Sequence, residues 1–202
     1  AYRVAAHLKV PIQTFDFEKE YHDKVVNYIF DSYRAGLTPN PDVLCNNEIK
    51  FKLFLDHASK LGFDKIATGH YANIKEDKNG FHLLRGIDPN KDQSYFLAGL
   101  NQKQLSKAVF PIGDIIKPEV RKIAKKARLP NADKKDSQGI CFIGKIDLKT
   151  FLSQKIKPIV GDIVDTSGNK IGKHEGVWFY TIGQRKGLDI GGSGPWYVVS
   201  KD

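Results

Sequence analysis

The chain has 202 residues, of which 41% are hydrophobic and 27% charged, a balance that allows one or two globular domains with a buried core. No apolar run approaches the roughly 18 residues that a membrane helix needs, and the first residues lack a secretion signal. These features predict a cytoplasmic protein with no membrane partner. The net charge of +9 favours a polyanionic partner, nucleic acid ahead of a membrane surface, unless the protein is simply basic throughout.

Residues 1–74 alternate between helical and strand patterns. Apolar spacing predicts a helix ending at Leu8, a strand at 12–17, a helix at 18–35, a helix from about 46 to 61 and a strand at 64–67. Such βαβ units build a mainly parallel sheet. Gly69 follows the last strand, where it either lets a nucleotide approach the backbone or simply closes a turn. Because the sequence begins with Ala and contains no Met, we expect a partial chain that starts inside a βα unit.

The middle of the chain carries a hairpin pattern at 75–90, with its turn at 78–80, and a helix-like stretch at 91–100. A later helix has Pro118 in its first turn. From 117 to 136 there are eight Lys or Arg and three acidic residues, an excess of five positive charges. This excess predicts contact with a phosphate backbone, and the alternative is an ordinary solvated face.

Beyond about residue 145 the helical pattern gives way to short strand-like runs separated by turns. These runs lie at 162–165, 170–172, 177–182 and 196–199. They predict a small β-rich domain. Aromatic and basic residues meet at 178–187, an arrangement that suits either single-stranded RNA or the core of this domain.

The only two cysteines, Cys45 and Cys141, are too few for a thiolate metal site or a secreted disulfide scaffold, so we predict no metal site. Either Asn40 or Asn46 can cap the helix near Cys45, which would leave the thiol in or just before its first turn. The helix dipole there would increase the thiolate fraction. Asp42, three residues earlier, can act as a general acid or base in the same pocket. Alternatively, Asp42 caps a turn and Cys45 only packs.

Cys141 follows a polar stretch, and Gly139 allows an unusual turn just before it. A cysteine at such a loop-to-strand junction can move and react. Its neighbours Ile140 and Phe142 equally suit a buried, inert residue. Spacing alone therefore leaves both cysteines undecided between chemistry and packing.

Several motifs together resemble one family. They are Thr38-Pro39-Asn40-Pro41-Asp42 with Cys45-Asn46, Ala67-Thr68-Gly69-His70-Tyr71-Ala72, Lys91-Asp92-Gln93-Ser94-Tyr95-Phe96-Leu97, Asp136-Ser137-Gln138-Gly139-Ile140-Cys141-Phe142-Ile143-Gly144 and Tyr180-Thr181-Ile182-Gly183-Gln184-Arg185. In this order, across nearly the whole chain, they resemble the bacterial-type tRNA-specific 2-thiouridylases, which are ATP-dependent tRNA uridine 2-sulfurtransferases.

The resemblance implies an α/β fold: an adenine-nucleotide-binding, doubly wound parallel sheet of the PP-loop ATPase type, followed by a small β-rich domain. Residues 1–144 would form the C-terminal portion of the catalytic domain, with tRNA-binding helices, and residues 145–202 the small central domain. The family's Ser-Gly-Gly-Val-Asp-Ser loop, which binds ATP phosphates, is absent from this sequence, as is a C-terminal β-barrel. We therefore expect residues 1–202 alone not to catalyse the reaction.

The resemblance also implies the chemistry. The enzyme would replace the C2 oxygen of the wobble uridine of tRNA with sulfur, after ATP has adenylated that oxygen. Cys141 would carry the sulfur as a persulfide, and Cys45 would be the partner nucleophile that releases it, leaving a Cys45–Cys141 disulfide. Asp42 would be the acid or base beside the target base.

The remaining implied contacts are those with ligands. Asn40, Pro41 and Asp42 would line the base pocket, and Gly69 would touch ATP, which brings Mg²⁺ with it. The residues that would contact tRNA are His70, Lys91, Asp92 and Gln93. The partners would be the anticodon loop of tRNA and a persulfide donor, either a cysteine desulfurase or a sulfur-relay protein.

Two other functions fit the sequence. One is a different ATP-dependent adenylating enzyme of the same α/β type. This enzyme would be either another tRNA thiolase or an amide-forming ligase, and the ligase would need no cysteines. The other is a non-catalytic RNA-binding module whose cysteines are structural. Activity after replacement of each cysteine distinguishes the ligase, and RNA binding without sulfur incorporation distinguishes the module.

Overall fold

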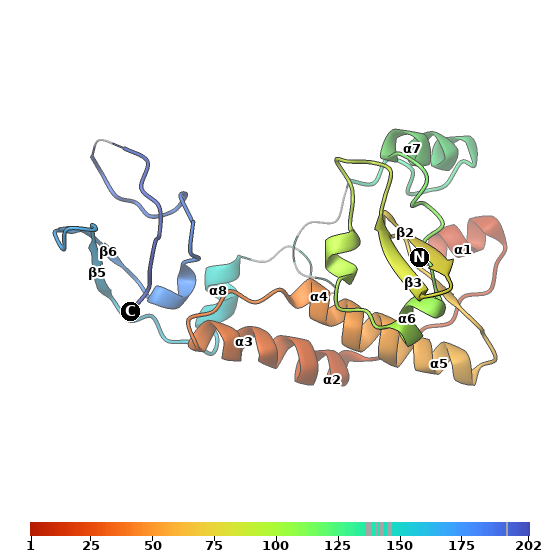
Figure 1. Cartoon of the computed structure of the whole chain (residues 1–202), viewed down its shortest axis with the longest axis horizontal. Coiled ribbons are helices and arrows are strands. Elements are labelled where there is room, and N and C mark those ends of the chain that lie inside the picture. Colours follow the sequence, from red (N-terminus) through yellow and green to blue (C-terminus); the bar gives the residue numbers. More distant parts are fainter. Residues whose placement is uncertain (136–138, 140, 142–143, 145–146, 193) are drawn as a thin grey trace. The chain divides into compact units, whose positions relative to one another are not determined.

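The computed structural model describes residues 1–135, 139, 141, 144, 147–192 and 194–202 (Figure 1). The chain divides into two compact units. Unit 1 comprises residues 1–22 and 42–138, and unit 2 comprises residues 23–41 and 139–202. No helix formed by the described residues is long and apolar enough to span a membrane.

A continuous helical run from Pro41 to Lys60 is the longest in the described chain (Figure 1). It comprises α4 (Pro41–Cys45), the π-helical η2 (Asn46–Phe54) and α5 (Leu55–Lys60). Proline suits the first helical position because no N–H is needed there, and Gly62, with φ +87°, supplies the left-handed residue that ends the run. The side-chain amide of Gln104 donates to the carbonyl oxygens of Asn47 and Phe51, at 3.1 and 3.0 Å, within the π-helical part.

The other helices of unit 1 are short. They are α1 (Tyr2–Leu8), α2 (Glu18–Tyr21), the 3₁₀ helix η3 (Ser94–Leu97), α6 (Gln102–Ser106) and α7 (Lys117–Lys126). A reciprocal capping box starts α6: Asn101 Oδ1 accepts from the Gln104 backbone, and Gln104 Oε1 accepts from the Asn101 backbone. Gln104 therefore caps α6 and also donates hydrogen bonds to η2.

Two pairs of strands complete unit 1. β1 (Ile66–Ala67) runs parallel to β4 (Ala108–Val109), with Ile66 opposite Ala108. β2 (Ala72–Asp77) and β3 (Gly80–Arg85) form an antiparallel hairpin in which Asp77 lies opposite Gly80. The predicted strand at 64–67 and the predicted hairpin are confirmed, and Gly80 adopts the positive φ of 115° that its tight turn requires.

The core of unit 1 lies between the long helical run and the parallel strands. Phe51 and Leu55 of the run pack with Ile66 and Ala108 of the strands. Further members of this core are Ala58, Ala72, Leu97, Leu100, Leu105 and Phe110. Because these residues come from distant parts of the sequence, burying them fixes the helix, the parallel pair and the 94–105 segment against one another.

Unit 2 contains the π-helical η1 (His22–Val26), apart from its first residue, α3 (Asn27–Arg34), α8 (Leu148–Ser153), β5 (Gly161–Val164), β6 (Lys170–His174) and the 3₁₀ helix η4 (Val177–Phe179). The rings of Phe30 and Phe151 stack at 5.0 Å, and Arg34 donates to the carbonyl oxygen of Lys155 at 3.2 Å. These contacts hold α8 on α3. β5 and β6 pair antiparallel, with Gly161 opposite His174.

Three sequence predictions of strands differ from the structure. Residues 12–17 form no strand, because no neighbouring strand pairs with them; instead Phe15 packs against Phe17 and His57. The predicted strand at 177–182 begins as the 3₁₀ helix η4, and 196–199 makes only two backbone bonds, at Val198. The doubly wound sheet is not confirmed, because the parallel pairing among the described residues is the two-stranded pair of β1 and β4.

The helical predictions hold better. The helix ending at Leu8 is confirmed, and residues 18–34 are helical through α2, η1 and α3. The helix expected from about 46 begins earlier, at Pro41. Only residues 94–97 of the helix-like stretch 91–100 are helical.

Candidate functional site

Cys45 lies inside the long helical run, not at its start. The run begins at Pro41, with Asn40 before it and Asp42 in its first turn, so Cys45 follows that first turn. Its side chain is fully buried, with 0% exposure. The prediction that the thiol lies in or just before the first turn is therefore wrong, because the helix starts at the proline and the thiol points into the protein interior.

Asn46 and Asn47, directly after Cys45, hold a second segment against the helix. The Nδ2 group of Asn46 donates to the carbonyl oxygen of Phe96 at 2.9 Å, while the residue is only 1% exposed. Gly99 lies so close to the Asn47 amide that a Cβ there would clash with it. Within the described chain, the Oδ1 atoms of Asn46 and Asn47 are buried without a hydrogen-bond partner. These contacts bring the segment after Gln93 onto the helix that carries Asp42 and Cys45.

Gly69 and His70 follow the carboxyl end of β1. The side of Gly69 where a Cβ would lie is open, with no atom within 4 Å. His70 Nδ1 lies 2.8 Å from the hydroxyl of Thr68, and its ring packs against Phe51 and Phe110 at 6.1 and 6.0 Å. Burial, helped by the nearby Lys50 charge, lowers the pKa of His70 to about 4. His70 is therefore neutral at physiological pH and serves as a hydrogen-bonding group.

The segment 91–93 is tied to the residue after His70. Gln93 Oε1 accepts from the Tyr71 backbone at 3.1 Å, and the Gln93 backbone donates to the Tyr71 carbonyl at 2.9 Å. Asp92 accepts from the backbones of Gly86 and Ser94, the Ser94 hydroxyl and the Arg85 side chain. Desolvation opposes the charge of Asp92, but these hydrogen bonds outweigh it and lower its pKa. Asp92 and Gln93 thus shape this loop beside His70.

Cys141 is half-buried, and neither it nor Cys45 forms a disulfide. The structure thus does not support a disulfide bond between Cys45 and Cys141. Of the motif at 136–144, only residues 139, 141 and 144 lie within the described part of the chain. Asn40 and Pro41 belong to unit 2 and Asp42 to unit 1.

The aromatic residues at 178–180 are partly buried and pack against neighbouring rings of unit 2. The rings of Trp178 and Phe179 meet edge to face at 6.3 Å, and Tyr180 meets His174 at 6.1 Å. The indole N–H groups of Trp178 and Trp196 are buried and lack a partner among the described residues. Tyr180 and Trp196 line a cavity of ≈ 260 Å³. Between RNA stacking and packing, the geometry favours packing.

Sequence reasoning missed two polar residues that organise unit 1. Asp88 is 5% exposed, and its carboxylate accepts from the backbones of Asn90 and Lys117, which caps the start of α7. The turn-forming string Asp88-Pro89-Asn90 was the available signal. The second residue is Gln104, whose bonds to the π-helical turns have no local sequence signature.

Among the described residues, no group of three or more His, Cys, Asp or Glu side chains is placed to hold a metal ion.

Comparison with known proteins assigns a family model to each of two parts of the chain. Residues 1–145 match the family model described as tRNA methyl transferase HUP domain, and residues 149–202 match the tRNA methyl transferase PRC-barrel domain. The chain is 56% identical to tRNA-specific 2-thiouridylase MnmA of Bacillus velezensis over 99% of its length. It is 57% identical to the protein of that name from Staphylococcus aureus strain JH9, over 98%. The chain belongs to this 2-thiouridylase family.

The family resemblance read from the motifs is thus confirmed. The chain spans about half the length of the curated relatives it matches, 54% in both cases. The HUP and PRC-barrel matches agree with a nucleotide-binding α/β domain followed by a small β-rich domain. The individual site residues stay predictions.

Proposed function

We propose that this chain takes part in ATP-dependent 2-thiolation of the wobble uridine of tRNA. The observation that carries the proposal is the identity of 56–57% with relatives named for tRNA-specific 2-thiouridylation, over 98–99% of the chain. The buried Cys45 on the helix that begins with Pro41 and Asp42, and the second thiol at Cys141, are the groups this chemistry requires.

The proposed reaction has two stages. The C2 oxygen of uridine attacks the α-phosphorus of ATP, pyrophosphate leaves, and the C2 oxygen becomes part of a good leaving group. The terminal sulfur of a Cys141 persulfide then attacks C2, and AMP departs with that oxygen. Finally, the Cys45 thiolate attacks the Cys141 sulfur, and the bond between the two persulfide sulfurs breaks. Its electron pair stays on the transferred sulfur as 2-thiouridine.

This sequence of steps leaves a Cys45–Cys141 disulfide and consumes one persulfide sulfur. An external thiol reductant must reduce the disulfide, and a cysteine desulfurase or sulfur-relay protein must reload Cys141. Because Cys45 is fully buried, its attack on Cys141 requires a local opening around the helix.

Asp42 fits the role of acid or base because it lies in the first turn of the same helix as Cys45. In the proposal, Asn40, Pro41 and Asp42 line the pocket for the target base. Neutral His70, together with Lys91, Asp92 and Gln93, contacts the anticodon loop. The bonds between Gln93 and Tyr71 support grouping these residues, since they hold the 91–93 segment beside His70.

We further propose that β1 and β4 belong to a doubly wound parallel sheet that binds ATP at the carboxyl ends of its strands. Gly69 fits this site, because it follows β1 and its open side leaves room for a nucleotide. Since the described residues lack a metal-binding cluster, Mg²⁺ would be held chiefly by the ATP phosphates.

The decisive experiment is mass spectrometry of nucleosides from tRNA of cells that lack the gene. Loss of 2-thiouridine at the wobble position supports the proposal, and normal 2-thiouridine overturns it. The family models are described as methyl transferases, so the same spectra must be searched for a lost methyl group, which changes the nucleoside mass by a different amount.

Complementation with Cys45→Ser and Cys141→Ser then separates sulfur chemistry from RNA binding alone. Each variant should restore no 2-thiouridine while still binding tRNA. Full activity of either variant would favour an adenylating enzyme that needs no thiol. Cys45→Ala provides the matched control, since it shows whether the oxygen of serine, and not the loss of sulfur, disturbs the buried site.

A further inference from the structure

Thr181 lies in the motif at 180–185, to which the proposed chemistry gives no role. Its hydroxyl oxygen lies 3.0 Å from the hydroxyl oxygen of Thr38, 143 positions earlier in the chain. Both residues belong to unit 2. Thr38 begins the segment 38–41, which contains Asn40 and Pro41. The contact therefore links this motif to the segment that is proposed to line the pocket for the target base.

The end of α3 fixes where this segment starts. The backbone N–H of Gly36 donates to the carbonyl oxygen of Tyr33 at 3.0 Å, and that of Leu37 donates to the carbonyl oxygen of Ser32 at 2.9 Å. Gly36 adopts a left-handed φ of 74°. This is the Schellman arrangement in which many helices end, with glycine at the position that strains other residues. The chain therefore leaves α3 in a defined direction just before Thr38.

The two prolines make the segment itself stiff, and we call residues 38–41 the arm. Each proline holds φ at about −65°, and a residue that precedes a proline is largely confined to an extended backbone. Thr38 and Asn40 are the residues that precede Pro39 and Pro41. The arm therefore has little internal freedom. Because Thr38 is at its base, a contact there sets the direction of the whole arm.

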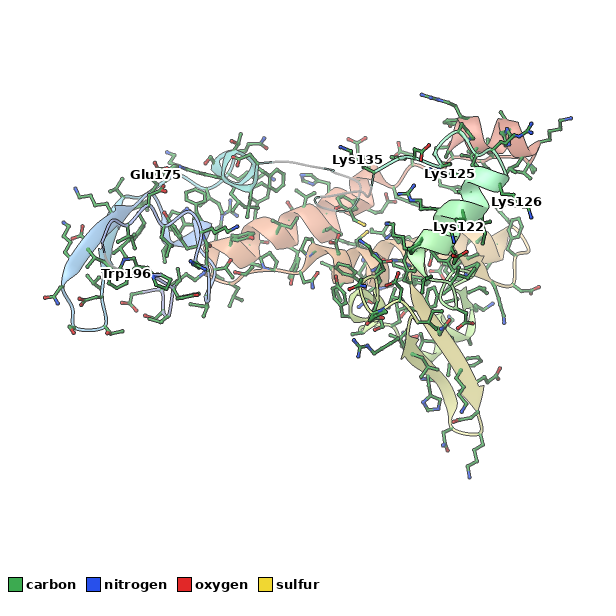
Figure 2. The ribbon with its side chains drawn as sticks, turned by 90° about the horizontal axis from the view of Figure 1, so that it is seen from above. Lys122, Lys125, Lys126, Lys135, Glu175 and Trp196 are labelled. Atoms are coloured by element: carbon green, nitrogen blue, oxygen red, sulfur yellow. The ribbon has the colours of Figure 1, made fainter. Side chains whose placement is uncertain are left out.

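Thr181 is a firm anchor for the arm. Its backbone N–H donates to Gln184 Oε1 at 2.9 Å, and its carbonyl oxygen accepts from the Gln184 backbone at 2.9 Å. These bonds close the turn 181–184, in which Gly183, at φ +83°, supplies the left-handed residue. Gly183 also donates to the carbonyl oxygen of Val198 at 2.7 Å, on the segment that contains Trp196 (Figure 2). The hydroxyl of Thr181 is thus held in place from both sides of the turn.

The two threonines are also connected through α8. Lys149 of α8 forms an ion pair with Glu175, which lies between β6 and η4 (Figure 2). The same helix packs on α3 through stacked phenylalanine rings. A closed circuit of contacts therefore runs within unit 2 from α3 to α8, on to the segment that carries Thr181, and back through Thr38 to α3. The contact between the threonines completes a frame that other contacts have already ordered.

We propose that Thr181 is a positioning residue for the target uridine: its hydroxyl holds Thr38, and with it the arm, in the direction that forms the base pocket. This inference rests on the proposed function, which assigns Asn40 and Pro41 to that pocket. Most affinity for RNA comes from its phosphate backbone, whereas a preformed pocket helps a bound, unstacked base to reach a reactive geometry. The hydroxyl of Thr181 should therefore act on kcat and not on the KM for tRNA.

The first test measures the arm in the purified chain, without any reaction. Thr181→Val removes the hydroxyl and keeps the shape of the side chain, whereas Thr181→Ser keeps the hydroxyl. Backbone NMR order parameters of Thr38 and Asn40 should fall from about 0.85 toward about 0.6 in Thr181→Val and stay high in Thr181→Ser. Thr166→Val, at an exposed position between β5 and β6, is the matched control and should change neither value. Unchanged order parameters in Thr181→Val would overturn the proposal.

The second test measures thiolation of tRNA by the enzyme expressed from its gene. Thr181→Val should lower kcat by about 2- to 10-fold, the range expected for one lost hydrogen bond, with the KM for tRNA unchanged. Thr181→Ser should restore the rate. Thr38→Val should cause the same loss, and the double Val variant should be no slower than either single variant, because both changes remove the same contact. Losses that multiply in the double variant would refute the proposal.

Two further outcomes separate positioning from other roles. A lower midpoint of urea unfolding in Thr181→Val with unchanged kcat would mean that Thr181 is only structural, and would overturn the proposal. A raised KM for tRNA with unchanged kcat would overturn it in favour of an RNA contact. If the unaltered enzyme forms no 2-thiouridine, the proposed function fails, and the order parameters still decide whether Thr181 holds the arm.

Discussion

The half-buried imidazole of His70 should make unit 1 sensitive to mild acid. Its pKa falls from an ordinary 6.5 to about 4 in the folded protein, first because of burial against Phe51 and Phe110 and then because of Lys50. Between these values the unfolded chain binds a proton that the folded chain rejects. Folding stability is therefore retained above pH 6.5 and is lost as the pH falls toward 4.

One pH unit of this difference corresponds to about 1.36 kcal/mol, so the full loss is at most about 3 kcal/mol, of which about 2 kcal/mol develops between pH 6.5 and 5. Urea unfolding followed by far-ultraviolet circular dichroism at pH 7, 6 and 5 measures it. His70→Asn keeps a polar atom near the Thr68 hydroxyl but cannot titrate, so its stability should change less with pH than that of the unaltered chain.

His82→Asn is the control, because His82 is exposed on β3 and its contact with Asp77, at 2.9 Å, is a surface pair whose loss should cost about 0–1 kcal/mol. Tryptophan fluorescence follows unit 2 as an internal reference for unit 1, since Trp178 and Trp196 both lie in unit 2. Parallel pH profiles for His70→Asn and the unaltered chain would refute the reasoning, because burial of His70 would then have no energetic consequence.

Three further predictions follow from packing and hydrogen bonding. Gln104→Leu removes the donor to Asn47 and Phe51 and should cost about 1–3 kcal/mol of unfolding free energy in urea, whereas Gln154→Leu, in unit 2, should cost less than about 0.5 kcal/mol. Leu97→Ala empties a fully buried site and should cost about 2–5 kcal/mol, against little for Leu61→Ala at a 49% exposed position; equal costs would contradict the assigned core. Gly113→Ala should lower the midpoint of thermal unfolding, because the added Cβ would collide with the Ala72 carbonyl. Gly69→Ala should leave that midpoint unchanged and should weaken ATP binding measured by calorimetry.

Local sequence patterns predicted those elements whose stability depends on neighbours in the chain. The Asn79-Gly80 turn indicated the hairpin, and the apolar spacing indicated the helices ending near Leu8 and Lys60. The strand at 12–17 was a wrong prediction for the opposite reason. A strand is stable only when another strand pairs with it, and none of the described residues does so here.

The same distinction between local sequence and packing applies to the candidate site. The motif strings around Cys45, Gly69 and Gln93 were sufficient to predict the family, because a family is a property of residue order. The strings did not reveal that Cys45 lies after the first helical turn and is fully buried. Nor did they reveal that the side chains of Asp92 and Gln93 accept hydrogen bonds from the backbones of Gly86 and Tyr71.

The sequence by itself therefore determined the family, the order of the helices and hairpin, and the types of residue available for chemistry. Only the tertiary structure decided the state of those residues. His70 is neutral because Phe51 and Phe110, far apart in the chain, exclude water from it. The ends of α1 and α7 lie together because His7 reaches the carbonyl oxygen of Ala127 across 120 positions. Burial and electrostatic potential depend on distances in space, and those distances arise only when remote segments pack together.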